Sequence, residues 1–286
     1  MTDPTENTSA HECKIKIKQW PVLAAMLGGI AILLGVLYIM GMQYCGGTYS
    51  DFTPSLIAEA PAPTLTPSID QTTVSVGDII QFGPYDWRVL DVQGSRALII
   101  TDRVIDYKMY HHTWEAVTWE TSEIRRWLND DFLNRFSQQE QERITTTTVV
   151  NHDNPWDFSD CCGYVSTPGG NNTIDRVFLL SIDEVLRYFG DSGMVARGAV
   201  MGVHERNDDV YHELFSWGIL DHYSEARIAL RLGGSARWWW LRSPGDSPRR
   251  AAIVGPDGRL ILRGDSVFWV GDGDGVRPAL WLHLES

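Results

Sequence analysis

The chain has 286 residues, of which 43% are hydrophobic, and its 37 acidic and 24 basic side chains give a formal net charge of −13. This length supports one sizeable hydrophobic core. The acidic excess argues against a nucleic-acid partner, because proteins bind phosphate backbones through clustered Lys and Arg side chains.

The first predicted element is a membrane span. Residues 20–42 contain no charged side chain, and about 20 apolar residues suffice to cross a bilayer, whereas a cleaved signal peptide has an apolar core of about 7 to 15 residues. The run therefore predicts an uncleaved transmembrane signal anchor. Lys14, Lys16 and Lys18 precede it, which places residues 1–19 in the cytoplasm by the positive-inside rule. We expect a single-pass protein of the cell membrane whose C-terminal domain is extracellular.

Two further features belong to this tether. Ala25 and Gly29 have the small-xxx-small spacing that lets membrane helices pack, so the transmembrane helix offers a route to a homo-oligomer. Residues 43–73 are rich in Pro, Thr and Ser and cannot bury enough apolar area to fold. They predict an extended stalk that carries the domain of residues 74–286.

The domain opens with β-strand signals and continues with helical ones. Short runs separated by turn residues predict a three-stranded antiparallel meander over residues 77–82, 87–92 and 96–100. Apolar residues at spacings of three and four predict a helix over residues 122–136. Two capping boxes predict two more helix starts, at Ser137 with Glu140 and at Ser181 with Glu184. The second of these helices is expected to end at Gly190.

The rest of the chain returns to β structure. Residues 177–180 predict a short strand, and residues 191–223, which are irregular and rich in His and acids, predict an insertion. Glycine-punctuated β segments complete the chain, over residues 237–242, 251–254, 259–263, 267–270 and 276–284. This mixture predicts an α+β fold.

Residues 237–245, RWWWLRSPG, contain three consecutive tryptophans. Because side chains alternate along a strand, Trp238 and Trp240 face one way and Trp239 the other, so the segment is apolar on both faces. This predicts a central, buried strand, paired with the other two-sided apolar run at residues 278–282. Trp239 remains a candidate for stacking on a ligand if it ends at a groove.

Four sequence blocks stand out along the domain: GPYDWRVL at residues 83–90, TWE and RRWLN at residues 118–129, WWLRSPG at residues 239–245, and GVRPALWL at residues 275–282. Together they resemble an uncharacterised bacterial domain, frequent in surface or membrane-anchored proteins of Gram-positive bacteria. The resemblance covers about residues 74–286, and implies no known activity.

The C-terminal blocks are more distantly similar to the C-type-lectin fold, in its formylglycine-generating-enzyme and phage-receptor-binding branch. That resemblance implies a twisted antiparallel sheet with flanking helices and long loops, and a binding function instead of a reaction. It also implies structural roles for Arg242 and Arg277, as donors to backbone carbonyls or to a buried carboxylate such as Glu120 or Asp183. Cys161 and Cys162 lie far from these strands in sequence, so the thiol chemistry of that enzyme is not expected.

Candidate ligand-binding residues lie in the expected loops. His111 and His112 stand near Tyr107, Tyr110 and Trp114 and line either a pocket or the core. Arg249 and Arg250 are candidates for gripping a carboxylate or phosphate. With Trp239, these residues form the predicted ligand-binding set: Trp114, His111, His112, Trp239, Arg249 and Arg250.

Three patterns can indicate either a metal or catalytic site or an ordinary structural feature. Asp272 and Asp274 alternate with glycines, as in a calcium turn or an ordinary hairpin. We expect no cofactor, with calcium at this turn as the one alternative. The histidines 204, 212 and 222 stand among acids, but their spacing fits no compact zinc motif and favours a solvated insertion. Gly190-Asp191-Ser192-Gly193 copies a protease nucleophile motif, yet it follows a helix and is interpreted as the end of that helix.

The leading hypothesis is an extracellular recognition module for a glycan, a cell-wall component or a protein, with no catalytic residue assigned. A metal-dependent hydrolase or modifying enzyme that uses the histidines of segment 111–112 or 204–222 is the first alternative. A structural accessory domain of an envelope complex is the second.

Overall fold

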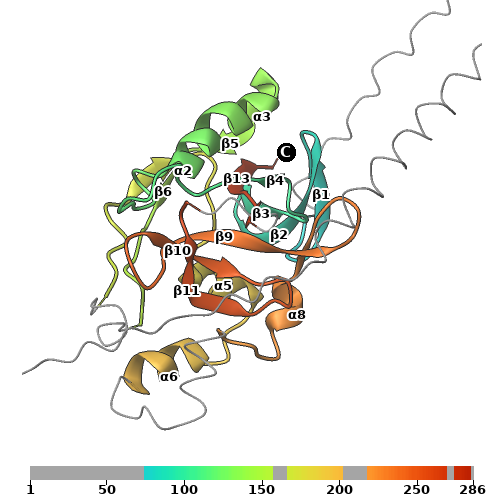
Figure 1. Ribbon diagram of the computed structural model, residues 1–286. Helices are drawn as coiled ribbons and strands as arrows, with labels where there is room; N and C mark the ends of the chain where they lie inside the picture. Colours follow the sequence, from blue (N-terminus) through green and yellow to red (C-terminus); the bar gives the residue numbers. More distant parts are fainter. Residues whose placement is uncertain (1–73, 157–165, 202–217, 269–273, 285–286) are drawn as a thin grey trace, which may run out of the picture. The chain divides into compact units, whose positions relative to one another are not determined.

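The computed structural model describes residues 74–156, 166–201, 218–268 and 274–284 (Figure 1). All of these belong to one compact unit, Leu65–Ser286. The predicted cytoplasmic tail, membrane span and stalk lie outside the described residues. Cys161, Cys162, His204, His212 and Asp272 also lie outside them. Within the described ranges, no helix has both the length and the apolar character needed to cross a membrane.

The first sheet contains the predicted meander. Its strand order is β1-β2-β3-β13-β5, and every neighbouring pair is antiparallel. The strands are β1 (Ile79–Phe82), β2 (Tyr85–Gln93), β3 (Arg96–Thr101), β13 (Ala279–His283) and β5 (Ile144–Thr145). The pairing of β1, β2 and β3 confirms the predicted antiparallel meander. It could be predicted because local turn residues determine the pairing of consecutive strands.

The second sheet is built around the tryptophan strand and has the order β11-β10-β9-β12-β4, with β8 paired to β9 at one end. Its strands are β11 (Leu260–Ser266), β10 (Arg250–Val254), β9 (Ala236–Pro244), β12 (Asp274–Val276), β4 (Asp106–Tyr107) and β8 (Ala229–Leu230). Trp239 and Trp240 are both 0% exposed. The prediction of a central, buried strand is confirmed.

The predicted pairing of the tryptophan strand with residues 278–282 is wrong. β9 pairs antiparallel with β10 and parallel with β12, while β13 lies in the other sheet between β3 and β5. Two apolar faces show that a strand is covered on both sides, but they carry no information about its hydrogen-bonded neighbours. The two apolar runs therefore lie inside different sheets.

The helices follow the predicted start and stop signals. Both capping boxes are present, at Ser137 with Glu140 and at Ser181 with Glu184, and the second helix ends at Gly190, whose φ is +109°. The segment predicted as one helix over residues 122–136 begins as α2 (Glu123–Trp127) and continues as π-helix and 3₁₀-helix turns, η1 (Leu128–Phe132) and η2 (Leu133–Arg135). The other helices are α3 (Gln138–Arg143), α5 (Ile182–Phe189), α6 (Met194–Met201) and α8 (Ser224–Arg227).

Two predicted strands are shorter than expected. Residues 177–180 make only one bridge, from Phe178 to Ala279, because this buried segment runs into the helix cap at Ser181. The segment at 267–270 does not continue β11, which ends at Ser266, and its second half lies outside the described residues. A two-stranded sheet that was not predicted joins β6 (Thr147–Val149) to β7 (Thr173–Asp175).

Arg242 joins separate segments in the interior. Its guanidinium donates to the backbone carbonyls of Leu179 (2.7 Å) and Val150 (3.0 Å), and to the side chain of Asn151 (3.2 Å). It also forms a two-point ion pair with Glu184. The predicted structural role holds, but the carboxylate is the capping residue of α5 instead of Glu120 or Asp183.

Arg277 plays a similar part next to the first sheet. Its Nε donates to the backbone carbonyl of Thr101 at 2.8 Å, and its guanidinium lies 5.1 Å from the centre of the Trp239 ring. Burial lowers the pKa of Arg277 to about 10, and the charge of Asp102 offsets this only in part. Both arginines therefore belong to the scaffold.

Candidate functional site

The loop between β4 and α2 carries the candidate histidines, and β9 holds this loop in place. The Trp240 ring Nε1 donates to the backbone carbonyl of Lys108 at 2.9 Å, and the Tyr110 hydroxyl donates to the carbonyl of Arg242 at 3.0 Å. Tyr110 is buried, and burial raises the pKa of its hydroxyl above the usual value. The buried part of the aromatic strand thus holds Lys108 and Tyr110 in place.

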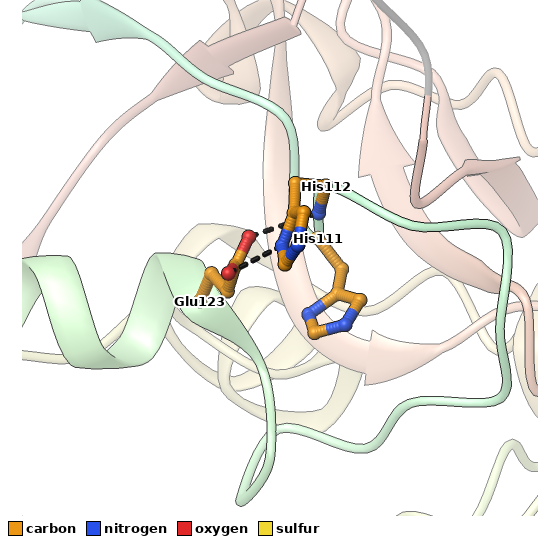
Figure 2. Close-up of side chains that lie close together, drawn as sticks. All are labelled: His111, His112 and Glu123. Carbon is orange, nitrogen blue, oxygen red and sulfur yellow. Dashed lines mark hydrogen bonds and ion pairs between the residues drawn. The ribbon is translucent and has the colours of Figure 1, made fainter.

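His112 is exposed and bound to the first residue of α2. Its backbone N–H donates to Glu123 Oε2 at 2.9 Å, and its ring Nδ1 contacts Glu123 Oε1. Figure 2 shows the Glu123 carboxylate at the start of the helix facing both groups. Burial opposes ionisation of Glu123, but the hydrogen bonds from His112 outweigh it, so the pKa of Glu123 lies below its ordinary value. Glu123 is therefore ionised at this site.

His111 is only 7% exposed and points to a different carboxylate. Its Nε2 lies 2.8 Å from Glu115 Oε1, which also accepts a hydrogen bond of 2.7 Å from the Thr113 hydroxyl. These bonds from His111 and Thr113 lower the pKa of Glu115. The other ring nitrogen, Nδ1, is buried and has no hydrogen-bond partner among the described residues. The rings of His111 and His112 are 5.3 Å apart.

A cavity of about 360 Å³ opens beside these residues. Aromatic and apolar side chains form much of its wall, together with one ammonium group and the His112–Glu123 pair. The Lys108 Nζ lies 4.4 Å from the centre of the Trp127 ring, and the Arg135 guanidinium lies 5.2 Å from it. The lining residues are Tyr107, Lys108, Met109, His112, Glu123, Ile124 and Trp127.

A second loop meets the first at Trp114. The Val117 backbone N–H donates to the carbonyl of Pro248 at 2.8 Å, and the Arg249 guanidinium lies 5.9 Å from the centre of the Trp114 ring. Trp114 is 56% exposed, and Arg249 is exposed as well. Two of the predicted ligand-binding residues, 135 positions apart in sequence, therefore form one surface feature.

Comparison with known families identifies the domain. The model of a family described as a domain of unknown function, DUF6273, matches residues 94–284, which is more than half of the chain. The chain belongs to the DUF6273 family. The prediction of an uncharacterised domain is confirmed, although the sequence block at residues 83–90 lies before the matched range. No curated protein and no solved structure matches the chain.

Two residues of the predicted ligand-binding set, Trp239 and Arg250, are held by contacts within this DUF6273 domain. Trp239 is fully buried, and its Nε1 donates to the backbone carbonyl of Arg227 at 3.1 Å, so the ring does not reach a groove. Arg250 is half-buried; its Nε lies 3.6 Å from an Asp246 carboxylate oxygen, and its Nη1 donates to the carbonyl of Gly264 at 3.3 Å. Both are held by their neighbours because each lies in a strand of the second sheet.

The protease-like motif is the end of a helix. Ser192 donates to Asp221 at 2.6 Å, and the same carboxylate is paired with Arg227 at 3.1 Å. Burial opposes the charge of Asp221, but the bonds from Ser192 and Arg227 prevail and lower its pKa. In the described part of the chain, no histidine contacts Ser192; the exposed His222 ring packs on Tyr223 instead. The motif therefore has no catalytic geometry in these residues.

Sequence reasoning missed Glu115, Glu123, Lys108 and Trp127, the side chains that complete the site of the DUF6273 domain. Glu115 stands four positions after His111, and Glu123 directly follows the N-cap residue Ser122. Both the i,i+4 spacing of Glu115 from His111 and the position of Glu123 at the helix start could be seen in the sequence. The fold was needed to show that the start of α2 comes back to His112. The calcium site at Asp272 and Asp274 stays a prediction, because Asp272 and the side chain of Asp274 are not among the parts that the structure describes.

Proposed function

We propose that this DUF6273 protein is a membrane-anchored extracellular recognition module, and that the cavity beside α2 binds its ligand. The uncharged run at residues 20–42, preceded by three lysines, supports the anchor. The mostly antiparallel sheets and the order of the C-terminal blocks support a C-type-lectin-like relationship. A binding site that is concave and largely apolar, with a few polar groups, is the usual form of a ligand pocket.

The proposal rests mainly on one observation: Lys108 lines the cavity together with the aromatic side chains of Tyr107 and Trp127. Lys108 is the only lysine after residue 18, and neither it nor Arg249 forms an ion pair with another described residue. A half-buried cation beside aromatic rings favours a ligand with an apolar face and an anionic group. Of a glycan, a cell-wall component and a protein, a carboxylate-bearing cell-wall glycan fits this chemistry best, and the predicted anchor would keep the domain near it.

Binding of soluble peptidoglycan fragments tests this site. Lys108→Met removes the charge but keeps a flexible stem against Trp127, and we expect it to weaken binding about tenfold or more, as loss of a charged hydrogen bond costs about 1.5–3 kcal/mol. Titration calorimetry on the purified full chain measures the affinity. The matched control is Arg197→Met, which removes an exposed charge on α6, away from α2 (Figure 1). Equal affinity of the Lys108→Met and unmodified chains would contradict the proposal.

A metal-dependent hydrolase is the second candidate, because the two imidazoles lie with a carboxylate at the edge of the cavity. Incubation of the zinc-loaded chain with the same fragments separates the two functions. Recognition predicts that the fragments are recovered intact, whereas release of new reducing ends or amino groups would favour the hydrolase.

A further inference from the structure

We propose that His111, His112 and Glu123 bind one transition-metal ion of the zinc class, at the wall of the cavity. One nitrogen of each ring and one oxygen of the carboxylate lie within 4.8 Å of one another. Figure 2 shows the three side chains converging from the loop and from the first turn of α2. This site goes beyond the recognition function, which needs no metal.

The donor set determines the class of ion. Two imidazoles and one carboxylate suit zinc, copper or nickel, whereas calcium and magnesium require mostly oxygen ligands. Donor atoms around a tetrahedral zinc lie roughly 3.3 Å apart, given Zn–N distances of about 2.0–2.1 Å. Glu123 already contacts the ring of His112. Because His112 is exposed and Glu123 is half-buried, both side chains have room to move toward that spacing around the fixed ring of His111.

The ring of His111 gives an independent indication. It is buried, and its Nδ1 has no partner among the described residues, which is costly for a buried polar atom. Glu115 accepts a hydrogen bond from Nε2, so the lone pair of the neutral ring stays on Nδ1. A carboxylate that fixes the outer nitrogen of a ligating histidine is the common arrangement around protein-bound zinc. A metal ion at Nδ1 would satisfy the unpartnered atom.

The surroundings leave one coordination position open. His112 and Glu123 both line the cavity, so an ion between them would face it. Three protein ligands with an open fourth position allow water or an anionic group of a bound molecule to complete the coordination. Two cations oppose the site: the Arg126 Nη1 lies 4.0 Å from Glu123 Oε1, and Lys108 lines the same cavity. Arg126 is exposed, so its side chain can turn away.

Zinc titration of the full chain, stripped of metal by a chelator, tests the proposal. Calorimetry and elemental analysis are expected to find one tightly bound zinc per chain, and zinc is expected to raise the thermal unfolding midpoint. His112→Asn and Glu123→Gln should each reduce the affinity at least tenfold. Glu115→Gln, which changes the partner of His111 but none of the three proposed ligands, should reduce it about tenfold. Circular dichroism checks that each variant is folded.

The control is His152→Asn. His152 is exposed and pairs with one carboxylate, Asp183, at 2.5 Å, so its loss should leave zinc affinity unchanged. Lys108→Met should also retain zinc, which separates failure of this site from failure of the recognition site. Absence of stoichiometric zinc, or equal affinity of a folded His112→Asn or Glu123→Gln chain, would overturn the proposal.

Discussion

Replacing Arg242 with methionine is expected to prevent stable folding of the domain. The substitution strands the Glu184 carboxylate and leaves the carbonyls of Leu179 and Val150 without their donor in the interior. Breaking a buried ion pair by removing one partner costs about 3–5 kcal/mol, a large share of the roughly 5–15 kcal/mol that stabilises a typical domain. Denaturant unfolding followed by circular dichroism measures the loss, which we expect to appear as a much lower midpoint or as insoluble protein.

A more exposed ion pair provides the control for this prediction. Arg88 and Asp102 lie 2.9 Å apart, with side chains 41% and 27% exposed, so Arg88→Met should change stability by about 1 kcal/mol or less. If Arg242→Met unfolded at the same denaturant concentration as Arg88→Met, the role of Arg242 as an interior cross-link would be wrong.

Trp239→Ala is the second substitution with a large expected effect. The indole is fully buried, donates to the carbonyl of Arg227, packs on Phe189 and lies under the Arg277 guanidinium. Removing a buried tryptophan side chain costs about 3–5 kcal/mol, because packing is lost and a cavity remains. Chemical denaturation of the full chain measures it. A loss below about 1 kcal/mol, the range of surface substitutions, would show that this ring is not part of the core.

Local signals explain why much of the fold could be predicted. The meander, both capping boxes and the glycine at the end of α5 each depend on residues within a few positions of one another. The pairing of β9 with β12, and the place of β13 in the other sheet, depend on contacts between distant segments. Two-sided apolar runs look alike wherever they pair, so the sequence could not choose between those arrangements.

The candidate site was predicted only in part, for a similar reason. The loop with His111, His112 and Trp114 was found from its residue types. Glu123 was hidden, because the helical pattern around it indicated core packing, and its contact with His112 depends on where α2 begins. A groove remained an alternative for Trp239, because alternation along a strand shows which face a ring takes, not whether another layer covers it.

One paired measurement on Trp239→Phe and Lys108→Met tests most directly whether the buried tryptophan strand stabilises the fold while the cavity beside α2 binds the ligand. For each full-length variant, the denaturation midpoint and the affinity for acidic peptidoglycan fragments are determined together. We predict that Trp239→Phe lowers the midpoint, because the bond to Arg227 is lost, and keeps the affinity of the unmodified chain. Lys108→Met, at the half-buried lysine of the cavity wall, should keep the midpoint and weaken binding. The reverse pattern, with unchanged stability and lost binding in Trp239→Phe, would contradict the assignment of the tryptophan strand to the scaffold.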